Sequence, residues 1–265
     1  MYNLDNGQAS QILQDEQAVG FDWKPGTHNI AYGQPFDPNY FARHGTEPTL
    51  AKGLAQIDVD SREKIELVQP ERGLHLVAPV WSPDGRFLSF QEVYLMEGSG
   101  KFGFYDFESG EYIAWDEPIG GYSWGRNGET IAYDLLTYVA QGTEAIWVEP
   151  REGGDPTRLS LQIDNGFAYS PVYSPEGDRL VYLADLDGLD ANMATLFVVD
   201  AAVGEPRELG TFDSAGYLSW TADGYHLLMT RGPWDNSEIL LLSTTDGSLR
   251  VLAVGSQPAW NPGQN

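Results

Sequence analysis

One short motif recurs six times along the chain and constrains its fold more than any other feature. In each copy an aromatic residue is followed by two or three turn-forming residues and then by glycine. The copies begin at Trp23, Trp81, Trp124, Tyr173, Trp220 and Trp260. The intervals between successive aromatics are 58, 43, 49, 47 and 40 residues. A period of this size indicates that the chain is built from repeated structural units.

Two columns of apolar or aromatic residues follow the motif, seven and nine places after its aromatic. Because alternate residues of a strand point to the same side, both columns are expected on one face of a strand. Proline, asparagine or aspartate, and glycine favour a tight turn, so the motif is expected to join two antiparallel strands. The copies at Trp23 and Trp260 carry glycine one place early, which predicts a shorter turn. The columns are Ile30, Leu88, Ile131, Leu180 and Leu227, and Tyr32, Phe90, Tyr133, Tyr182 and Met229.

A second hairpin follows in the repeats, for example residues 54–59 turning into 64–67, and residues 196–200 turning into 207–209. Four short strands per repeat, with no helical period between them, predict an all-β fold. Four-stranded antiparallel sheets repeated at this spacing form a β-propeller. An open β-sandwich of many hairpins is the alternative. A sandwich, however, gives no reason to repeat one aromatic–turn–glycine signature at near-constant spacing.

The number of motif copies predicts six blades. Residues 2–13 match the second hairpin of a blade, and residues 256–260 match a first strand. We therefore expect one domain over residues 1–265, a six-bladed β-propeller whose last blade is shared by the N- and C-termini and can be incomplete. Pairing the termini would protect strand edges that are otherwise exposed. Five complete blades with additional ends is the alternative.

The motif copies at residues 81–86 and 173–182 closely resemble the WD-like repeats of the TolB-type propellers. This resemblance covers nearly the whole chain. TolB-type propellers are bacterial envelope proteins, and related propellers precede the hydrolase domain of prolyl oligopeptidases. The resemblance thus implies a bacterial protein of the periplasm or the extracellular space. It is specific for fold and not for function, because the motif is a structural turn.

The chain is strongly acidic, with 39 acidic against 15 basic residues and a net charge of −24. Such a charge repels phosphate backbones and anionic lipid, so we expect no nucleic-acid partner. No stretch approaches the roughly 20 apolar residues that a membrane-spanning helix needs, so no membrane insertion is expected. The absence of cysteine excludes disulfides, thiolate catalysis and zinc–thiolate sites. We expect a monomer.

Enzyme signatures are mostly missing from the sequence. It contains no Gly-x-Ser-x-Gly elbow, no phosphate-binding glycine motif and no His-Glu-x-x-His. His28 and His226 follow motif turns and are expected to be solvent-exposed. We therefore expect a non-catalytic protein with no catalytic residues. One alternative is a carbohydrate-active or hydrolytic propeller that uses carboxylates and histidine. The other is a propeller module cut from a longer enzyme, because the chain begins in mid-strand without a signal peptide.

The long connections between the second and third strands of the repeats are the expected binding surface. They span roughly residues 33–52, 91–101, 134–144, 184–194 and 230–238 and lie on the face opposite the motif turns. Aromatic residues beside arginine and histidine are typical of recognition surfaces. We expect a protein or peptide partner there, with glycan as a further class. The candidate residues are Tyr40, Arg43, His44, Tyr94, Tyr138, Arg231 and Trp234.

One of these connections has the spacing of a calcium loop. Asp185, Asp187 and Asp190 place hard oxygen ligands close together, although the glycine is misplaced for an EF-hand and no glutamate closes the loop. A solvated acidic turn explains the same residues without a metal. We therefore expect no cofactor, and calcium is the alternative.

Overall fold

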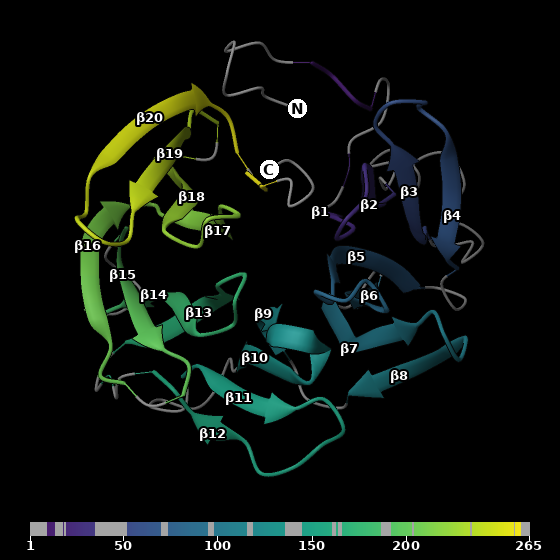
Figure 1. Cartoon of the computed structure of the whole chain (residues 1–265), viewed down its shortest axis with the longest axis horizontal. Helices are drawn as coiled ribbons and strands as arrows, with labels where there is room; N and C mark the ends of the chain where they lie inside the picture. The colour runs from purple at the N-terminus through teal and green to yellow at the C-terminus, as the bar shows by residue number, and fades with distance from the viewer. Residues whose placement is uncertain are drawn as a thin grey trace. The chain divides into compact units, whose positions relative to one another are not determined.

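The described part of the chain folds into five four-stranded antiparallel sheets, which we number as blades 1 to 5 (Figure 1). The computed structural model describes residues 10–13, 18, 20–34, 52–69, 74–94, 98–115, 119–135, 145–160, 163, 166–186, 192–202, 204–233, 235–256 and 258–260. In every blade the four strands pair in chain order. This is the architecture that the strand pattern of the repeats predicts.

The first two blades belong to one compact unit, formed by residues 1–81 and 88–115. Blade 1 consists of β1 (Phe21–Trp23), β2 (Asn29–Gly33), β3 (Leu54–Asp58) and β4 (Lys64–Val68). Blade 2 consists of β5 (Leu74–Trp81), β6 (Phe87–Tyr94), β7 (Gly98–Asp106) and β8 (Glu111–Trp115). Strands β1 and β5 are in contact, so the first strands of these consecutive blades lie side by side.

The remaining blades belong to a second unit, formed by residues 82–87 and 116–265. Blade 3 consists of β9 (Ile119–Trp124), β10 (Thr130–Leu135), β11 (Trp147–Pro150) and β12 (Thr157–Arg158), with a 3-10 turn, η2 (Arg126–Gly128). Blade 4 consists of β13 (Phe167–Tyr173), β14 (Arg179–Asp185), β15 (Met193–Asp200) and β16 (Arg207–Asp213). Blade 5 consists of β17 (Gly216–Trp220), β18 (His226–Arg231), β19 (Glu238–Ser243) and β20 (Leu249–Val254). Strand β13 contacts both β9 and β17.

The repeated motif forms the turn between the first two strands of each blade. Its glycines have φ between 66° and 70°, in the left-handed region that glycine adopts without strain. The turn after Trp23 spans the same length as the others, because Trp23 pairs with Ile30 as Trp81 pairs with Leu88. The prediction of a shorter turn there is wrong. The strand pairing fixes the length of the turn. The residue with positive φ, Gly26, is only one place closer to the motif aromatic than in the other copies.

Both predicted columns lie in the core. All ten of their side chains are at most 9% exposed, and Leu88, Ile131, Leu180 and Leu227 are completely buried. The motif aromatics Trp81 and Trp124 are each 4% exposed, as expected for residues that pack the blades.

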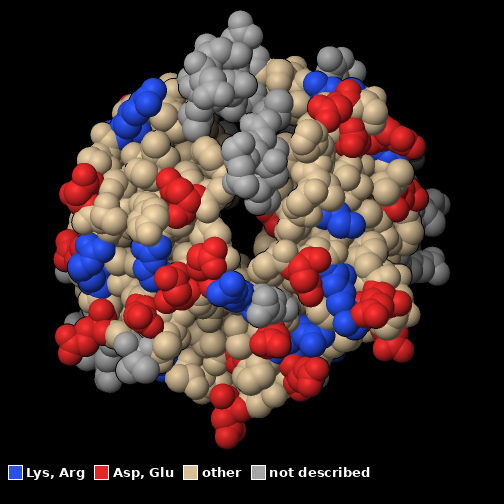
Figure 2. Space-filling view, viewed as in Figure 1, with Lys and Arg blue, Asp and Glu red and all other residues tan. Residues whose placement is uncertain are grey.

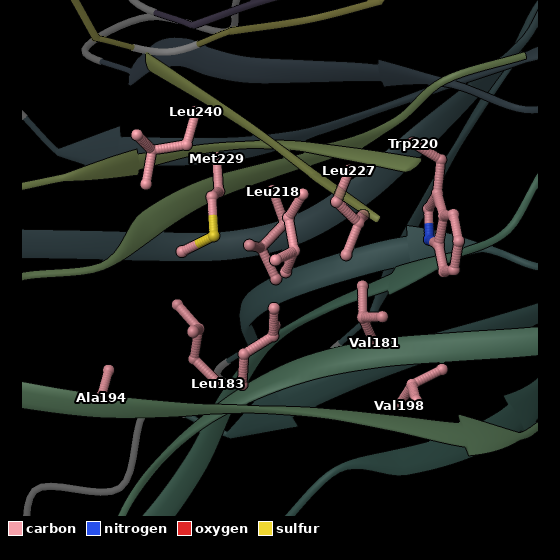
Figure 3. Close-up of a cluster of buried hydrophobic side chains, with 11 residues drawn as sticks. Val181, Leu183, Ala194, Val198, Leu218, Trp220, Leu227, Met229 and Leu240 are labelled. Atoms are coloured by element: carbon pink, nitrogen blue, oxygen red, sulfur yellow. The ribbon is translucent and has the colours of Figure 1, made fainter. Parts of the chain in front are cut away.

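Blades 4 and 5 pack face to face through an apolar cluster, shown in Figure 3. Blade 4 contributes Val181, Leu183, Ala194, Leu196 and Val198, and blade 5 contributes Leu218, Trp220, Leu227, Met229, Leu240 and Leu242. The indole Nε1–H of Trp220 also donates a hydrogen bond of 3.0 Å to the carbonyl of Val172 in blade 4. The motif aromatic therefore joins two blades by both packing and hydrogen bonding.

A second link between consecutive repeats uses the residue just before the motif aromatic. The Asp22 Oδ2 accepts a hydrogen bond of 2.8 Å from the backbone N–H of Trp81. The Oγ of Ser123 accepts one of 3.0 Å from Tyr173 N–H. In the same way Ser219 Oγ accepts one of 3.0 Å from Trp260 N–H. The backbone N–H of Trp260, the sixth motif aromatic, is thus bonded to the preceding repeat in the same way as those of Trp81 and Tyr173.

The prediction of six blades is nevertheless wrong, because the residues that the structure describes form five. Residues 258–260 belong to no strand, and neither do residues 10–13, while residues 1–9 lie outside the described part of the chain. A motif copy marks the end of a first strand, but a blade also needs three strands after it. Counting turns therefore overestimates the number of sheets by one.

Candidate functional site

Four of the five described blades, all except blade 3, share a backbone feature three places before the motif aromatic. The φ angle there is positive at Gly20, Ala78, Ser170 and Tyr217, with values of 74°, 51°, 54° and 49°. In β5, β13 and β17 the pairing with the second strand also shifts register near this position, as in a β-bulge. A positive φ in a residue other than glycine costs roughly 1–3 kcal/mol and is concentrated at functional sites.

The carboxylate of Asp134 joins this position in blade 3 to its counterpart in blade 4. Asp134 lies on β10 and is 7% exposed. Its Oδ2 accepts hydrogen bonds from the backbone N–H of Gly121, at 3.0 Å, and of Ser170, at 2.8 Å. A Cβ atom on Gly121 would lie 2.8 Å from that oxygen, so glycine permits the close approach. Burial raises the pKa of Asp134 to about 6, against the opposing effect of the two hydrogen bonds.

This raised pKa predicts a specific dependence of stability on pH. The folded protein holds the Asp134 proton more tightly than the unfolded chain, whose carboxyl has a pKa near 3.8. The free energy of unfolding should therefore fall as pH rises from about 4 to 6, by about 2–3 kcal/mol from this group. Asp134→Asn keeps an oxygen acceptor and should remove that contribution. Urea denaturation of both proteins between pH 4 and 8 measures it.

Asp22 supplies the matched comparison for this experiment. Burial raises its pKa to about 7, while hydrogen bonds from Trp81 and Trp23 N–H act in the opposite direction. Asp22→Asn should therefore alter the pH profile up to about pH 7, one unit beyond the Asp134→Asn effect. Parallel profiles for wild type and Asp134→Asn would contradict the assignment of a raised pKa to Asp134.

A shallow pocket of about 240 Å³ lies at one end of blade 4, and we call it the blade-four pocket. It is formed where β13 begins, β14 ends, β15 begins and β16 connects to β17. These are the strand ends opposite the motif turns, which we call the loop ends. The lining residues are Phe167, Tyr169, Asp185, Asn192, Met193, Ala194, Ser214 and Ala215.

The blade-four pocket combines aromatic rings with negative charge. The ring centroids of Phe167 and Tyr169 are 5.3 Å apart, and the rings are tilted by 39°. Asp185 is 6% exposed. Burial raises the pKa of the Tyr169 phenol, and the negative charges of Asp185 and Asp134 raise it further. The pocket therefore favours a ligand with apolar surface and positive charge.

Comparison with known proteins rests on structure, since no protein-family model and no curated protein matches the sequence. The TolB protein of Acinetobacter baumannii matches with a TM-score of 0.73 and 17% identity, over 97% of this chain and 61% of that protein. A protein described as a TolB from Agrobacterium tumefaciens matches with a TM-score of 0.69 and 14% identity, over 94% of this chain and 87% of that one. The chain has a TolB-like β-propeller fold.

An enzyme shares this TolB-like fold. An oligogalacturonate lyase in complex with manganese matches with a TM-score of 0.65 and 14% identity, over 96% of this chain and 69% of the lyase. Identities this low carry the fold alone. The chain also spans less than two thirds of the Acinetobacter baumannii TolB.

The TolB-like fold places two of the predicted site residues at the loop ends of blades 4 and 5. Arg231 ends β18, and its Nη2 lies 2.6 Å from Glu238 Oε2, so the two side chains form an ion pair. Gly232 N–H donates a hydrogen bond to the carbonyl of Asp213, which brings this strand end to the end of β16. Asp185, predicted as a calcium ligand, lines the blade-four pocket.

The other predicted binding residues are not brought together by the described structure. Tyr94 ends β6, where its backbone pairs with Leu74. Tyr40, Arg43, His44, Tyr138 and Trp234 lie outside the described residues, as do Asp187 and Asp190. In the part of the chain that is described, no three His, Asp or Glu side chains are grouped as a metal ion would require. Calcium binding stays the alternative to the prediction of no cofactor.

The histidines on the motif-turn side are exposed, as predicted. The side chains of His28 and His226 are 50% and 39% exposed, and their Nδ1 atoms lie against Asp60 and Asp223. The hydrogen bond with Asp60 raises the pKa of His28. No helix among the described residues is long and apolar enough to cross a membrane.

Asp134 and most lining residues of the blade-four pocket were missed by sequence reasoning. Asp134 carries a usable signal, because it interrupts the apolar residues 131–135 of a predicted strand. A carboxylate in such a position is buried only where hydrogen-bond donors meet it. Phe167, Met193 and Ser214 carry no comparable signal, since their positions become related only through the pairing of strands.

Proposed function

We propose that this protein is a non-catalytic TolB-like propeller that binds a protein or peptide partner in the bacterial cell envelope, through the loop ends of blades 4 and 5. The observation that carries the proposal is that a pocket, an exposed tyrosine and residues with positive φ occur together in this part of blades 4 and 5. Ser170 and Ser214 have φ of 54° and 46°, and Ser214 lines the blade-four pocket.

Tyr217 provides the exposed aromatic surface. It follows the pocket residue Ala215 by two places, has φ of 49° and is 54% exposed. Tyrosine offers a large contact area at low conformational cost, which is why it is frequent among the residues that dominate binding energy. The positive φ of Tyr217 itself is a strained backbone conformation, and such strain is frequent at functional sites, which supports a binding role.

The proposed compartment and class of partner rest on the likeness to TolB proteins and on charge. The chain has a net charge of −24. On the face shown in Figure 2, the described Lys and Arg side chains lie interspersed among Asp and Glu. This distribution favours a neutral or basic partner over nucleic acid. A monomeric protein that does not insert into a membrane is part of the same proposal.

The second candidate function is a carbohydrate-active enzyme, which the structural likeness to an oligogalacturonate lyase favours. Oligogalacturonates carry a carboxylate on each sugar. At the loop ends of blades 3 and 4, the carboxyl groups of Asp134 and Asp185 are both buried. Bringing a polyanion to these groups is electrostatically unfavourable. The charge of the site therefore favours binding of a partner that is not anionic.

Selection of a displayed random-peptide library against the protein tests the proposal. We expect enriched peptides whose affinity falls at least tenfold in Tyr217→Ala, a loss of the size expected for a dominant binding residue. Tyr225→Ala is a matched control, because Tyr225 is also a tyrosine of blade 5 and also 54% exposed but lies in the motif turn. Loss of binding in Tyr225→Ala alone would contradict the choice of strand ends. Depolymerisation of oligogalacturonate, with no peptide enriched, would favour the enzyme.

A further inference from the structure

We propose that the blade-four pocket receives one basic side chain, lysine or arginine, of the bound peptide. This inference rests on the proposed function and adds the chemistry that the partner must present. The aliphatic stem of that side chain packs against the pocket wall, and its cationic head lies at the Asp185 end of the pocket.

The size of the pocket supports a single side chain. Its volume of about 240 Å³ is below the roughly 300–1,000 Å³ typical of pockets for complete small-molecule ligands. It opens at the loop ends, where blade 4 meets the connection to blade 5. A side chain projecting from a peptide that lies across these strand ends can enter it.

The wall of the pocket fits an aliphatic stem. Phe167 and Tyr169 present neighbouring rings, and Met193 is 45% exposed beside them. Thioether and aromatic surfaces pack well against methylene groups, and long basic side chains bury their stems in this way while keeping the charge near polar groups. The faces of the two rings also attract a cation.

The polar side of the pocket fits a cationic head. Asp185 lies across the β13–β14 ladder from Phe167 and is almost completely buried, and Asn192 and Ser214 add neutral polar groups. Asp134 adds a second negative charge that acts on Tyr169 from the side of blade 3. Carboxylates in surroundings of low dielectric attract a cation more strongly than they would in water.

The nearby arginine is paired with a carboxylate outside the pocket. Arg231 is the positive residue at the adjoining end of β18, and its guanidinium pairs with Glu238 at 2.6 Å. The carbonyl of Asp213 is occupied by Gly232 N–H, which holds this strand end in place. The charge of Arg231 is thus compensated within blade 5, by Glu238.

The test compares N-acetyl-lysine methylamide with its norleucine analogue, which keeps the stem and lacks the charge. The chain has four methionines, so methyl NMR of methionine gives few signals, and Met193 lies in the pocket wall. We expect the lysine probe to shift the Met193 methyl signal with a Kd at least tenfold lower than that of the norleucine probe. Asp185→Asn should remove this difference. The methyl signal of Met229, which is completely buried between blades 4 and 5, reports whether the variant is folded.

A second pair of variants keeps the test decisive if Asp185→Asn does not fold. Met193→Lys places a cation at the pocket and should weaken binding of the lysine probe at least tenfold, as measured by saturation-transfer NMR on the probe. Val251→Lys adds the same charge on β20, at a position with a similar exposure of 47%, and should have no effect.

The outcomes separate this inference from the proposed function. Equal binding of the two probes, or binding of lysine without a shift of Met193, overturns the assignment of the pocket. Selected peptides that depend on Tyr217 but need no basic residue also overturn it and leave the proposed function intact. Binding of the lysine probe without any selected peptide supports the pocket and contradicts the proposed function.

Discussion

Replacing Trp124 with alanine should lower the free energy of unfolding by about 3–5 kcal/mol, the range for removal of a buried aromatic side chain. Trp124 is 4% exposed and stacks on Phe87, with the ring centroids 5.7 Å apart and the planes 22° from parallel. The guanidinium of Arg151 lies 4.2 Å from the Phe87 centroid. Alanine would leave a cavity beside this stack, and urea denaturation followed by circular dichroism measures the loss.

Trp124→Phe is the control for this prediction. Phenylalanine keeps an aromatic ring against Phe87 and should lose clearly less stability than alanine does. A loss below 1 kcal/mol in Trp124→Ala would contradict the structural role of the motif aromatic. If binding of a selected peptide disappeared at the same time, Trp124 would belong to the binding surface instead.

Gly166→Ala should destabilise the protein by about 3 kcal/mol, at the upper end of the usual cost of overpacking. An added Cβ would lie only 1.8 Å from the carbonyl oxygen of Asp185, and backbone cannot yield as a flexible side chain does. The φ of Gly166 lies outside the left-handed range, so the effect is steric. Because Phe167 pairs with Asp185, the shift should also widen the blade-four pocket. Urea denaturation and the Met193 methyl signal measure the two effects.

Gly154→Ala is the matched control for the steric effect. The φ of Gly154 also lies outside the left-handed range, and an added Cβ would meet only the ring of Pro150, at 3.4 Å. We expect a change of at most about 0.5 kcal/mol, as for an ordinary surface substitution. Equal losses in the two variants would mean that backbone entropy, and not the contact with Asp185, decides the result.

The elements that the sequence predicts correctly depend on local chemistry. A turn of proline, aspartate and glycine needs only its own residues, and the column residues Leu88 and Phe90 follow from the alternation of a strand. The number of blades, in contrast, depends on strands that are distant from the motif in the sequence. Trp260 has the surroundings of a motif aromatic through its bond to Ser219, yet three more strands decide whether a blade exists.

The candidate site is harder to predict, because strand pairing creates it. The left-handed backbone at Ser170 and Tyr217 occurs in residues that do not favour it, so residue type gives no warning. Asp134 meets Ser170 N–H across 36 positions of the chain. The sequence does point to one end of the strands, since long irregular connections are where binding residues usually lie. Arg231 and Asp185, both expected there, lie at those ends.

The hydrogen bond that precedes each of three motif aromatics has an evolutionary consequence. Asp22, Ser123 and Ser219 each accept the backbone N–H of the aromatic in the following repeat. A backbone donor is the same whatever the side chain, so each join requires only a small polar acceptor. After duplication or loss of a whole repeat, the polar acceptor of one repeat would therefore still meet a backbone N–H in its new neighbour. Propellers joined in this way can change in length by recombination without first evolving a new interface.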